Sequence, residues 1–268
     1  DHLCSGISFQ FDDQSKFNPA MVEDIIGLEN EESKVAFLND MYELTYLRDV
    51  IERNHLKNAD GMRELVRVLA SSIGASSNPK RIADTFASVA KVKITDKTIK
   101  DYISHLEDAF LLEEALRYDV KGRKYIGSET KYFFEDMGLR NVALNFRQIE
   151  ETHIMENVIY NELRGRGFLV DVGLVEVWER NGEGKTLRKN LEVDFVVNKG
   201  SMRYYIQSAY ALPTPDKIDQ EERSLRNIGD SFKKIVIVKD DILPKRNDAG
   251  IVTISLKEFL MNRDCLDI

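Results

Sequence analysis

Residues 191–211 read LEVDFVVNKGSMRYYIQSAYA, and this stretch decides the predicted fold. Its first part, residues 191–198, and its last part, residues 203–211, are rich in the β-branched and aromatic side chains that favour strands. Gly200 lies between them and marks a turn. The stretch therefore predicts two neighbouring antiparallel strands.

Helical and strand patterns continue on both sides of this pair of strands. A group of antiparallel strands that is followed by a helix and a parallel-type strand is typical of a mixed sheet covered by helices. We therefore expect an α/β (α+β) domain over residues 135–268. Its further elements are expected to be helices over residues 149–166, 216–226 and 256–261, and strands over residues 168–172, 174–180, 234–239 and 251–254.

The first half of the chain predicts helices followed by a hairpin. The first 20 residues show no clear period and read as a loosely attached arm, and residues 31–53 form an amphipathic helix. Three short helices and a hairpin are the outline of a winged helix, so we expect an arm and helix over residues 1–59 and a winged-helix-like domain over residues 60–134. The expected elements are helices over residues 60–73, capped by Asp60, 79–89 and 97–110, capped by Thr95, and strands over residues 111–120 and 125–134.

Composition narrows the functional classes. The 268 residues carry 38 Lys and Arg against 46 Asp and Glu, a net charge of −8, which excludes a uniformly basic nucleic-acid binder but not a local basic face. Cys4 and Cys265 form no zinc motif, and we expect free thiols in a reducing compartment. Since no apolar run could span a membrane and no signal peptide is visible, we expect a cytoplasmic protein. The start, DHLCSG, lacks an initiator Met, so we expect a processed product or a piece of a longer chain.

Gly184, Lys185 and Thr186 invite comparison with a phosphate-binding loop. The first glycine of a GxxxxGK[ST] motif would fall at Glu179, and the residues that follow predict a strand rather than the helix whose N-terminus binds phosphate. We therefore expect a solvated hairpin turn at this position.

Three polar residues are set in otherwise apolar elements. Glu156 lies on the helix before the strands, Asp194 lies within LEVDFVV, and Gln207 lies within YYIQSAY. A buried charge is costly unless it is paired or binds a metal, and such groups can converge on one hard divalent cation. Mg²⁺ held by Glu156 and Asp194 would activate water and stabilise charge on a phosphodiester. The structural alternatives are a pairing of Glu156 with Arg164 or Arg166, a hydrogen-bonded Asp194, and Gln207 as a satisfied core amide.

Several segments occur together in an order that resembles a known family. The segments in the second half are HIMENVIYNELRGRGFLVDVG, LEVDFVV, YYIQSAYAL, EERSLRNI and KKIVIVKDD. Those in the first half are YLRDVIERN, LASSIG, TDKTIKDYISHLEDAFLL and KYFFEDMGLRNVAL. From about residue 30 onward the chain resembles the C-terminal region of a prokaryotic family of predicted AAA-type ATPases, which has a winged-helix-like middle section and a domain of unknown function, DUF4143.

The resemblance implies a non-ATPase region whose own ATPase module, with its ATP, would precede Asp1. It also implies that residues 135–268 are similar to the restriction-endonuclease-like (PD-(D/E)xK) fold. Active nucleases of that fold carry a helix Glu, a strand Asp and then Glu-x-Lys on the next strand. Glu156 and Asp194 match this pattern, but Gln207 replaces the second acid and Ala209 replaces the lysine.

These departures lead us to expect no catalytic activity, and a degenerate site in a chain that binds DNA or a partner protein. Alanine cannot position a water molecule, and the loss of one carboxylate weakens the attraction for a divalent cation. Two alternatives stay open: a Mg²⁺-dependent DNA nuclease that uses Glu156 and Asp194, and a pure protein-interaction module.

Basic residues gather around the expected recognition helix and wing. A helix N-terminus in the major groove and a wing on the phosphates are how such modules bind duplex DNA. Acidic residues such as Asp101 and Glu107 dilute this charge, so a solvated or interdomain face is the alternative. The candidate DNA-binding residues are Lys80, Arg81, Lys93, Thr95, Lys97, Thr98, Lys100, Lys121, Arg123 and Lys124.

Tryptophan, histidine and serine often mark binding or catalytic sites, but their positions predict no such site in this sequence. Trp178 is expected to pack in the core beside Val175 and Val177, which lie on the same strand. The four histidines show no metal-ligand spacing, and no GxSxG motif occurs.

Overall fold

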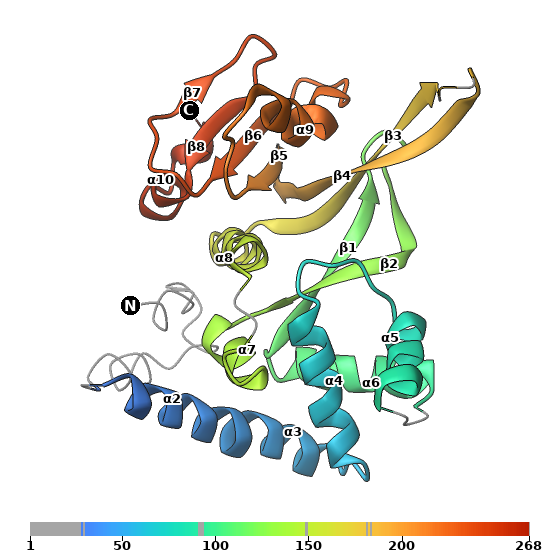
Figure 1. Cartoon of the computed structure of the whole chain (residues 1–268), viewed down its shortest axis with the longest axis vertical. Coiled ribbons are helices and arrows are strands. Elements are labelled where there is room, and N and C mark those ends of the chain that lie inside the picture. Colours follow the sequence, from blue (N-terminus) through green and yellow to red (C-terminus); the bar gives the residue numbers. More distant parts are fainter. Residues whose placement is uncertain are drawn as a thin grey trace. The chain divides into compact units, whose positions relative to one another are not determined.

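The computed structural model describes residues 28, 30–90, 94–147, 150–180, 182 and 184–267 (Figure 1). They divide into two compact units: unit 1 has the described residues up to Glu114 together with Thr130–Asn161, and unit 2 has Ala115–Glu129 and the described part of Glu162–Ile268. The predicted boundary around residues 135–148 falls inside unit 1, and the three-domain division stays a prediction. The predicted arm, Cys4 and Lys93 lie outside the described residues.

One continuous helix opens unit 1 and confirms the helix predicted over residues 31–53. It consists of α2 (Glu31–Asp40), a π-helical stretch (Met41–Leu47) and α3 (Arg48–Arg53). Its buried side chains include Leu38, Tyr42, Leu47 and Val50. The five-residue step from Tyr42 to Leu47 matches the i→i+5 hydrogen bond of a π-turn. The π-helical stretch therefore shifts the buried face, and a strict α-helical period misses Leu47.

Three shorter helices follow at nearly the predicted positions: α4 (Ala59–Ser71), α5 (Pro79–Thr85), which continues into a π-helical stretch (Phe86–Ala90), and α6 (Asp96–Asp108). Thr95 caps α6 as predicted, because its hydroxyl accepts from the Thr98 N–H at 3.1 Å. The predicted cap of α4 is wrong: Asn58, not Asp60, accepts from the Gly61 N–H at 2.8 Å. No helix in the described part of the chain is long and apolar enough to cross a bilayer.

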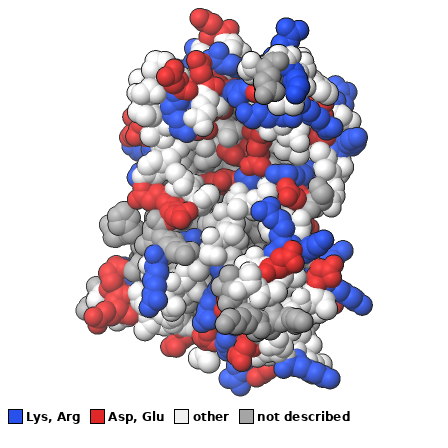
Figure 2. All heavy atoms as spheres, turned by 45° about the vertical axis from the view of Figure 1, so that its right-hand side comes forward, with Lys and Arg blue, Asp and Glu red and all other residues white. Residues whose placement is uncertain are grey.

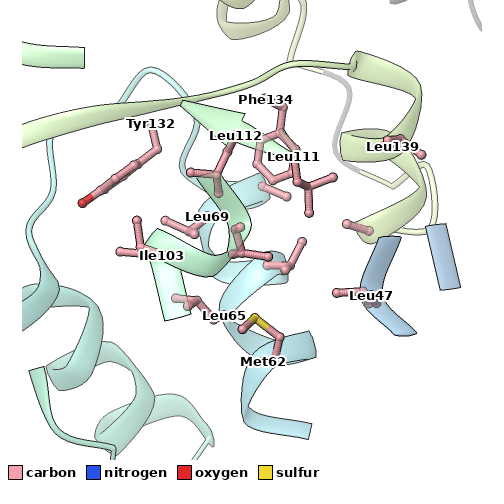
Figure 3. Close-up of a cluster of buried hydrophobic side chains, with 14 of the residues drawn as sticks. Leu47, Met62, Leu65, Leu69, Ile103, Leu111, Leu112, Tyr132, Phe134 and Leu139 are labelled. Atoms are coloured by element: carbon pink, nitrogen blue, oxygen red, sulfur yellow. The ribbon is translucent and has the colours of Figure 1, made fainter. Parts of the chain in front are cut away.

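The core of unit 1 joins these helices to two strands, β1 (Leu112–Asp119) and β2 (Lys124–Phe134), and to α7 (Met137–Ala143). Apolar side chains from all of these elements pack together in one cluster, and Figure 3 shows its part between α4, α6, β1, β2 and α7. Burying each large apolar side chain contributes about 1.5–3 kcal/mol. Asp136 caps α7, and burial raises the pKa of its carboxyl to about 6. Arg140 on α7 donates to the Ala70 carbonyl at 2.9 Å, where α4 ends.

Among the described residues, eight strands form one mixed sheet in the order β2-β1-β3-β4-β5-β6-β8-β7 (Figure 1). β3, β4 and β5 are antiparallel neighbours, whereas β1–β3, β5–β6 and β6–β8 are parallel pairs. The six strands after β2 are β3 (Leu169–Arg180), β4 (Thr186–Lys199), β5 (Met202–Ala209), β6 (Lys233–Val238), β7 (Lys245–Arg246) and β8 (Val252–Ser255). The later helices are α8 (Glu151–Gly165), α9 (Pro215–Arg226), α10 (Leu256–Met261) and a 3₁₀ turn (Cys265–Asp267).

This architecture confirms the α/β class with a mixed sheet and helices, and it corrects three details. Residues 168–172 and 174–180 were expected as separate strands, but they form the single strand β3 with an irregularity between Asp171 and Gly173. A Cβ atom on Gly173 would lie 2.8 Å from Val196 Cγ2, so the glycine permits the close approach of β4. Residues 181–190, NGEGKTLRKN, were expected as a charged turn, but β4 already starts at Thr186, so residues 186–190 are strand. The short strand β7 was not predicted.

Candidate functional site

Glu156 lies on α8, within unit 1, and its carboxylate is occupied by a lysine. Lys131 Nζ on β2 lies 2.7 Å from Glu156 Oε1, and the two side chains are 3% and 11% exposed. Gly74, at φ +70°, lies so near that a Cβ atom on it would come 2.8 Å from Glu156 Oε2. The chain therefore supplies a buried ammonium to Glu156 from β2, a residue that the sequence analysis did not single out.

Asp194 and Gln207 lie together in unit 2, where β4, β5 and α9 meet. Asp194 Oδ2 accepts from the Ser208 N–H at 2.8 Å. Gln207 Oε1 accepts from the Ser224 hydroxyl of α9 at 3.3 Å and lies 3.4 Å from the Asp194 N atom. The β4–β5 register ends at Phe195 and Ile206, so the Asp194 carboxylate extends the ladder past its last backbone pair. These contacts match the structural alternative, in which both groups close a hydrogen-bond network.

Replacement of Asp194 by alanine is therefore expected to lower the free energy of unfolding by about 1–3 kcal/mol, because the Ser208 N–H loses its acceptor in a partly buried position. Urea denaturation with and without Mg²⁺ measures this effect, and the loss is expected to be equal in both. Asp194→Asn, which keeps an acceptor oxygen, serves as the milder control. Stabilisation of the parent chain by Mg²⁺ that vanishes in Asp194→Ala would instead favour the metal site.

The three residues of the predicted metal site are thus divided between the two units. Glu156 belongs to unit 1, whereas Asp194 and Gln207 belong to unit 2. Each has a partner within its own unit, and Ala209, at the place of the expected lysine, is buried. Within the described ranges, no group of three or more His, Cys, Asp or Glu residues could hold a metal ion. The convergence of Glu156 with Asp194 stays a prediction.

A further buried carboxylate lies at the irregularity of β3. Asp171 Oδ2 accepts from the Tyr125 hydroxyl at 3.3 Å. Burial raises the pKa of Asp171, and this hydrogen bond and the nearby Arg203 offset part of that rise. The signal in the sequence was an aspartate between valines in LVDVG. Asp171 and Tyr125 therefore stabilise each other inside unit 2, and nothing places them at a catalytic centre.

The described candidates for DNA binding are exposed, apart from the half-buried Thr98, and they fall in different units. On α5 and α6 of unit 1, Lys80, Arg81, Lys97 and Lys100 are exposed, as is the capping residue Thr95, and Thr98 is half-buried. Lys121, Arg123 and Lys124 are exposed at the β1–β2 turn, which belongs to unit 2. The candidate residues therefore belong to two basic surfaces, one in each unit.

The predicted burial of Trp178 is wrong. Val175 and Val177 are buried, but Trp178 is 64% exposed. Successive side chains of a strand point to opposite faces, so Trp178 is out of phase with the two valines. This alternation was visible in the sequence and could have identified an exposed tryptophan.

Comparisons with known proteins find a family of unknown function and uncharacterized relatives. Residues 24–150 match the family model of a domain of unknown function, DUF8612. An uncharacterized protein of Haemophilus influenzae is 30% identical over 212 residues, which are 79% of this chain and 49% of that protein. The uncharacterized protein MJ1544 of Methanocaldococcus jannaschii is 27% identical over 241 residues, which are 89% of this chain and 50% of that protein. The chain spans about half the length of these curated relatives.

The solved structure of protein VC1899 from Vibrio cholerae aligns with 86% of this chain and 56% of that chain, at 14% identity and a TM-score of 0.32. The predicted membership in the family of AAA-type ATPases with DUF4143 is wrong, since the family model that matches is DUF8612. Segments quoted for that resemblance, such as TDKTIKDYISHLEDAFLL, lie inside residues 24–150. A capped amphipathic helix followed by a strand recurs in unrelated proteins because the same local hydrogen bonds and apolar spacing stabilise it.

Proposed function

We propose that the chain is a non-catalytic nucleic-acid-binding protein that contacts duplex DNA through α5 and the N-terminal end of α6. The observation that carries the proposal is the group of exposed cations on two helices that pack together: Lys80, Arg81, Lys97 and Lys100. Helices place cations against phosphates, and a helix N-terminus adds the favourable end of its dipole. The order α4, α5, α6, β1, β2 supports the winged-helix part of this proposal.

The second half of the proposal is that the α/β part has a nuclease-like arrangement without nuclease chemistry. The order α8, three antiparallel strands, α9 and a parallel strand supports the arrangement. The Lys131–Glu156 ion pair and the hydrogen bonds of Asp194 argue against metal binding, because they occupy the carboxylates that would hold Mg²⁺. Incubation with plasmid DNA and Mg²⁺ or Mn²⁺ tests this half. Cleavage that Asp194→Ala abolishes would favour the nuclease instead.

Fluorescence anisotropy with a labelled duplex across a salt series tests the DNA-binding half. We expect affinity to fall as salt rises, because bound cations release counterions from the phosphates. The double variant Lys97→Glu/Lys100→Glu is expected to bind at least about tenfold more weakly and to reduce the salt slope by about 2, one for each lost contact. Arg53→Glu, at the exposed end of α3, is the matched control. Binding with no salt dependence, or a double variant that binds like the parent, would favour a protein partner.

A further inference from the structure

The distal parts of β3 and β4 form a two-stranded extension, which we call the hairpin arm (residues 175–180 and 184–191). In the described strands, β1 pairs with β3 at Val172–Leu174, and β5 pairs with β4 from Phe195 onward. Between these limits, β3 and β4 continue to pair with each other as far as Arg180 and Thr186. The hairpin arm is therefore a narrow ribbon within unit 2 with fewer strand neighbours than the rest of the sheet (Figure 1).

Trp178 stands on one face of the hairpin arm beside an arginine. The register pairs Trp178 with Arg188, so the two side chains share a face. Leu187 pairs with Glu179 on the other face, and Glu179 forms an ion pair with Arg223 of α9. α9 therefore lies on the Glu179 face, and the indole of Trp178, at 64% exposure, lies on the opposite one. An indole and a guanidinium side by side offer a flat surface on which aromatic rings stack.

The surroundings of Trp178 are basic, although the chain as a whole carries −8. Lys121 Nζ donates to the Glu176 carbonyl at 2.6 Å, so the β1–β2 turn lies alongside the arm. Arg123, Lys124 and Arg180 make no ion pair with another described residue. Figure 2, in which the right-hand side of Figure 1 comes forward, shows Lys and Arg side chains gathered in its upper part. The exposed cations of the turn and the arm are Lys121, Arg123, Lys124, Arg180, Lys185, Arg188 and Lys189. Two of them are paired with acids of the arm, Arg188 with Glu176 at 2.6 Å and Lys189 with Glu179 at 3.9 Å, and the others leave an excess of positive charge.

We propose that the hairpin arm is a binding platform for single-stranded nucleic acid, in which an unpaired base stacks on Trp178 beside Arg188 while the cations of the β1–β2 turn contact the phosphates. Stacking on an aromatic side chain needs a base that is free of its duplex partner, and every base has a face that can stack. The local charge favours a polyanion over a second copy of this chain, because two copies would bring the same positive surfaces together. The platform contains no residue of α5 or α6, so this proposal can be tested independently of the proposal for duplex binding.

Tryptophan fluorescence tests the proposal directly, since Trp178 is the single tryptophan of the chain. We expect short oligo(dT) or oligo(rU) to quench its emission to saturation in low salt, and the two oligonucleotides distinguish DNA from RNA as the source of the unpaired bases. Anisotropy of a labelled oligonucleotide gives the affinity of the variants. Trp178→Ala is expected to weaken binding about tenfold, and Trp178→Phe, which keeps an aromatic face, is expected to recover much of the loss.

Leu187→Ala is the matched control, because it removes an exposed apolar side chain from the other face of the same arm and is expected to leave affinity unchanged. Circular dichroism melting checks that all three variants fold. Unchanged emission at saturating oligonucleotide, or equal affinity in Trp178→Ala, would overturn the proposal. Self-association that only Trp178→Ala abolishes would do so too, by assigning the face to a second copy. Loss of duplex binding in Lys97→Glu/Lys100→Glu with quenching retained would support the platform.

Discussion

Replacing Arg166 by methionine is expected to lower the free energy of unfolding by about 3–5 kcal/mol, one of the two largest effects we predict for a single side chain. The Arg166 side chain is only 5% exposed, and its Nε atom lies 2.7 Å from Glu162 Oε1. Its guanidinium also donates to the Arg263 carbonyl at 3.2 Å and to the Phe259 carbonyl, and it lies 4.5 Å from the centre of the Phe259 ring. Methionine fills similar space but leaves Glu162 and both carbonyls without these donors.

Urea denaturation followed by circular dichroism measures this loss. Arg166→Lys is expected to lose nearly as much, because a lysine ammonium cannot reproduce the fork of donors that reaches several acceptors at once. Lys257→Met on α10 is the control. Lys257 Nζ lies 2.8 Å from Asp241 Oδ2, and both side chains are exposed to solvent. That variant is expected to unfold at the parent's urea concentration. If Arg166→Met did so too, the chain segment from Phe259 to Arg263 would be held by apolar packing alone.

Local signals in the sequence predicted most elements because their physical causes lie within a few residues. Thr95 and the Thr98 N–H, which cap α6, are three residues apart. Pro79 lies in the first turn of α5, where a missing N–H costs nothing, and runs of β-branched and aromatic residues identified β5 and β6. The same signals place Asp194 and Gln207 on neighbouring strands, which the structure confirms.

Contacts between distant segments could not be predicted in this way. Arg166 finds acceptors more than ninety residues further along the chain, and Lys131 finds Glu156 across 25 residues. Which charge meets which depends on how α8 lies against β2, and one sequence contains no signal of that. The exposure of Trp178 is a different case, because strand alternation indicated its direction, but only the position of α9 decides which face of the hairpin arm is covered.

Replacing Lys131 by methionine is expected to destabilise unit 1 by about 3–5 kcal/mol at neutral pH, because it leaves the buried Glu156 carboxylate without its ammonium. An unpaired buried carboxylate has a raised pKa. When the pKa of an acid is higher in the folded state than in the unfolded one, stability decreases as pH rises above the ordinary pKa of that acid. Lys131→Met is therefore expected to be more stable at about pH 5 than at about pH 8, relative to the parent at the same pH.

The double variant Lys131→Met/Glu156→Met separates a structural ion pair from a metal ligand. A buried ion pair can often be replaced by apolar side chains of similar volume with little loss, so the double variant is expected to recover most of the stability. Arg63→Met, which breaks the half-exposed pair with Glu43 at 2.8 Å in the same unit, is the control and is expected to cost less than about 1 kcal/mol. Thermal melts of all variants with and without Mg²⁺ complete the test. Stabilisation of Lys131→Met by Mg²⁺ would show that Glu156 binds a metal ion once its lysine is removed. This result would favour the nuclease alternative, in which Glu156 is a metal ligand.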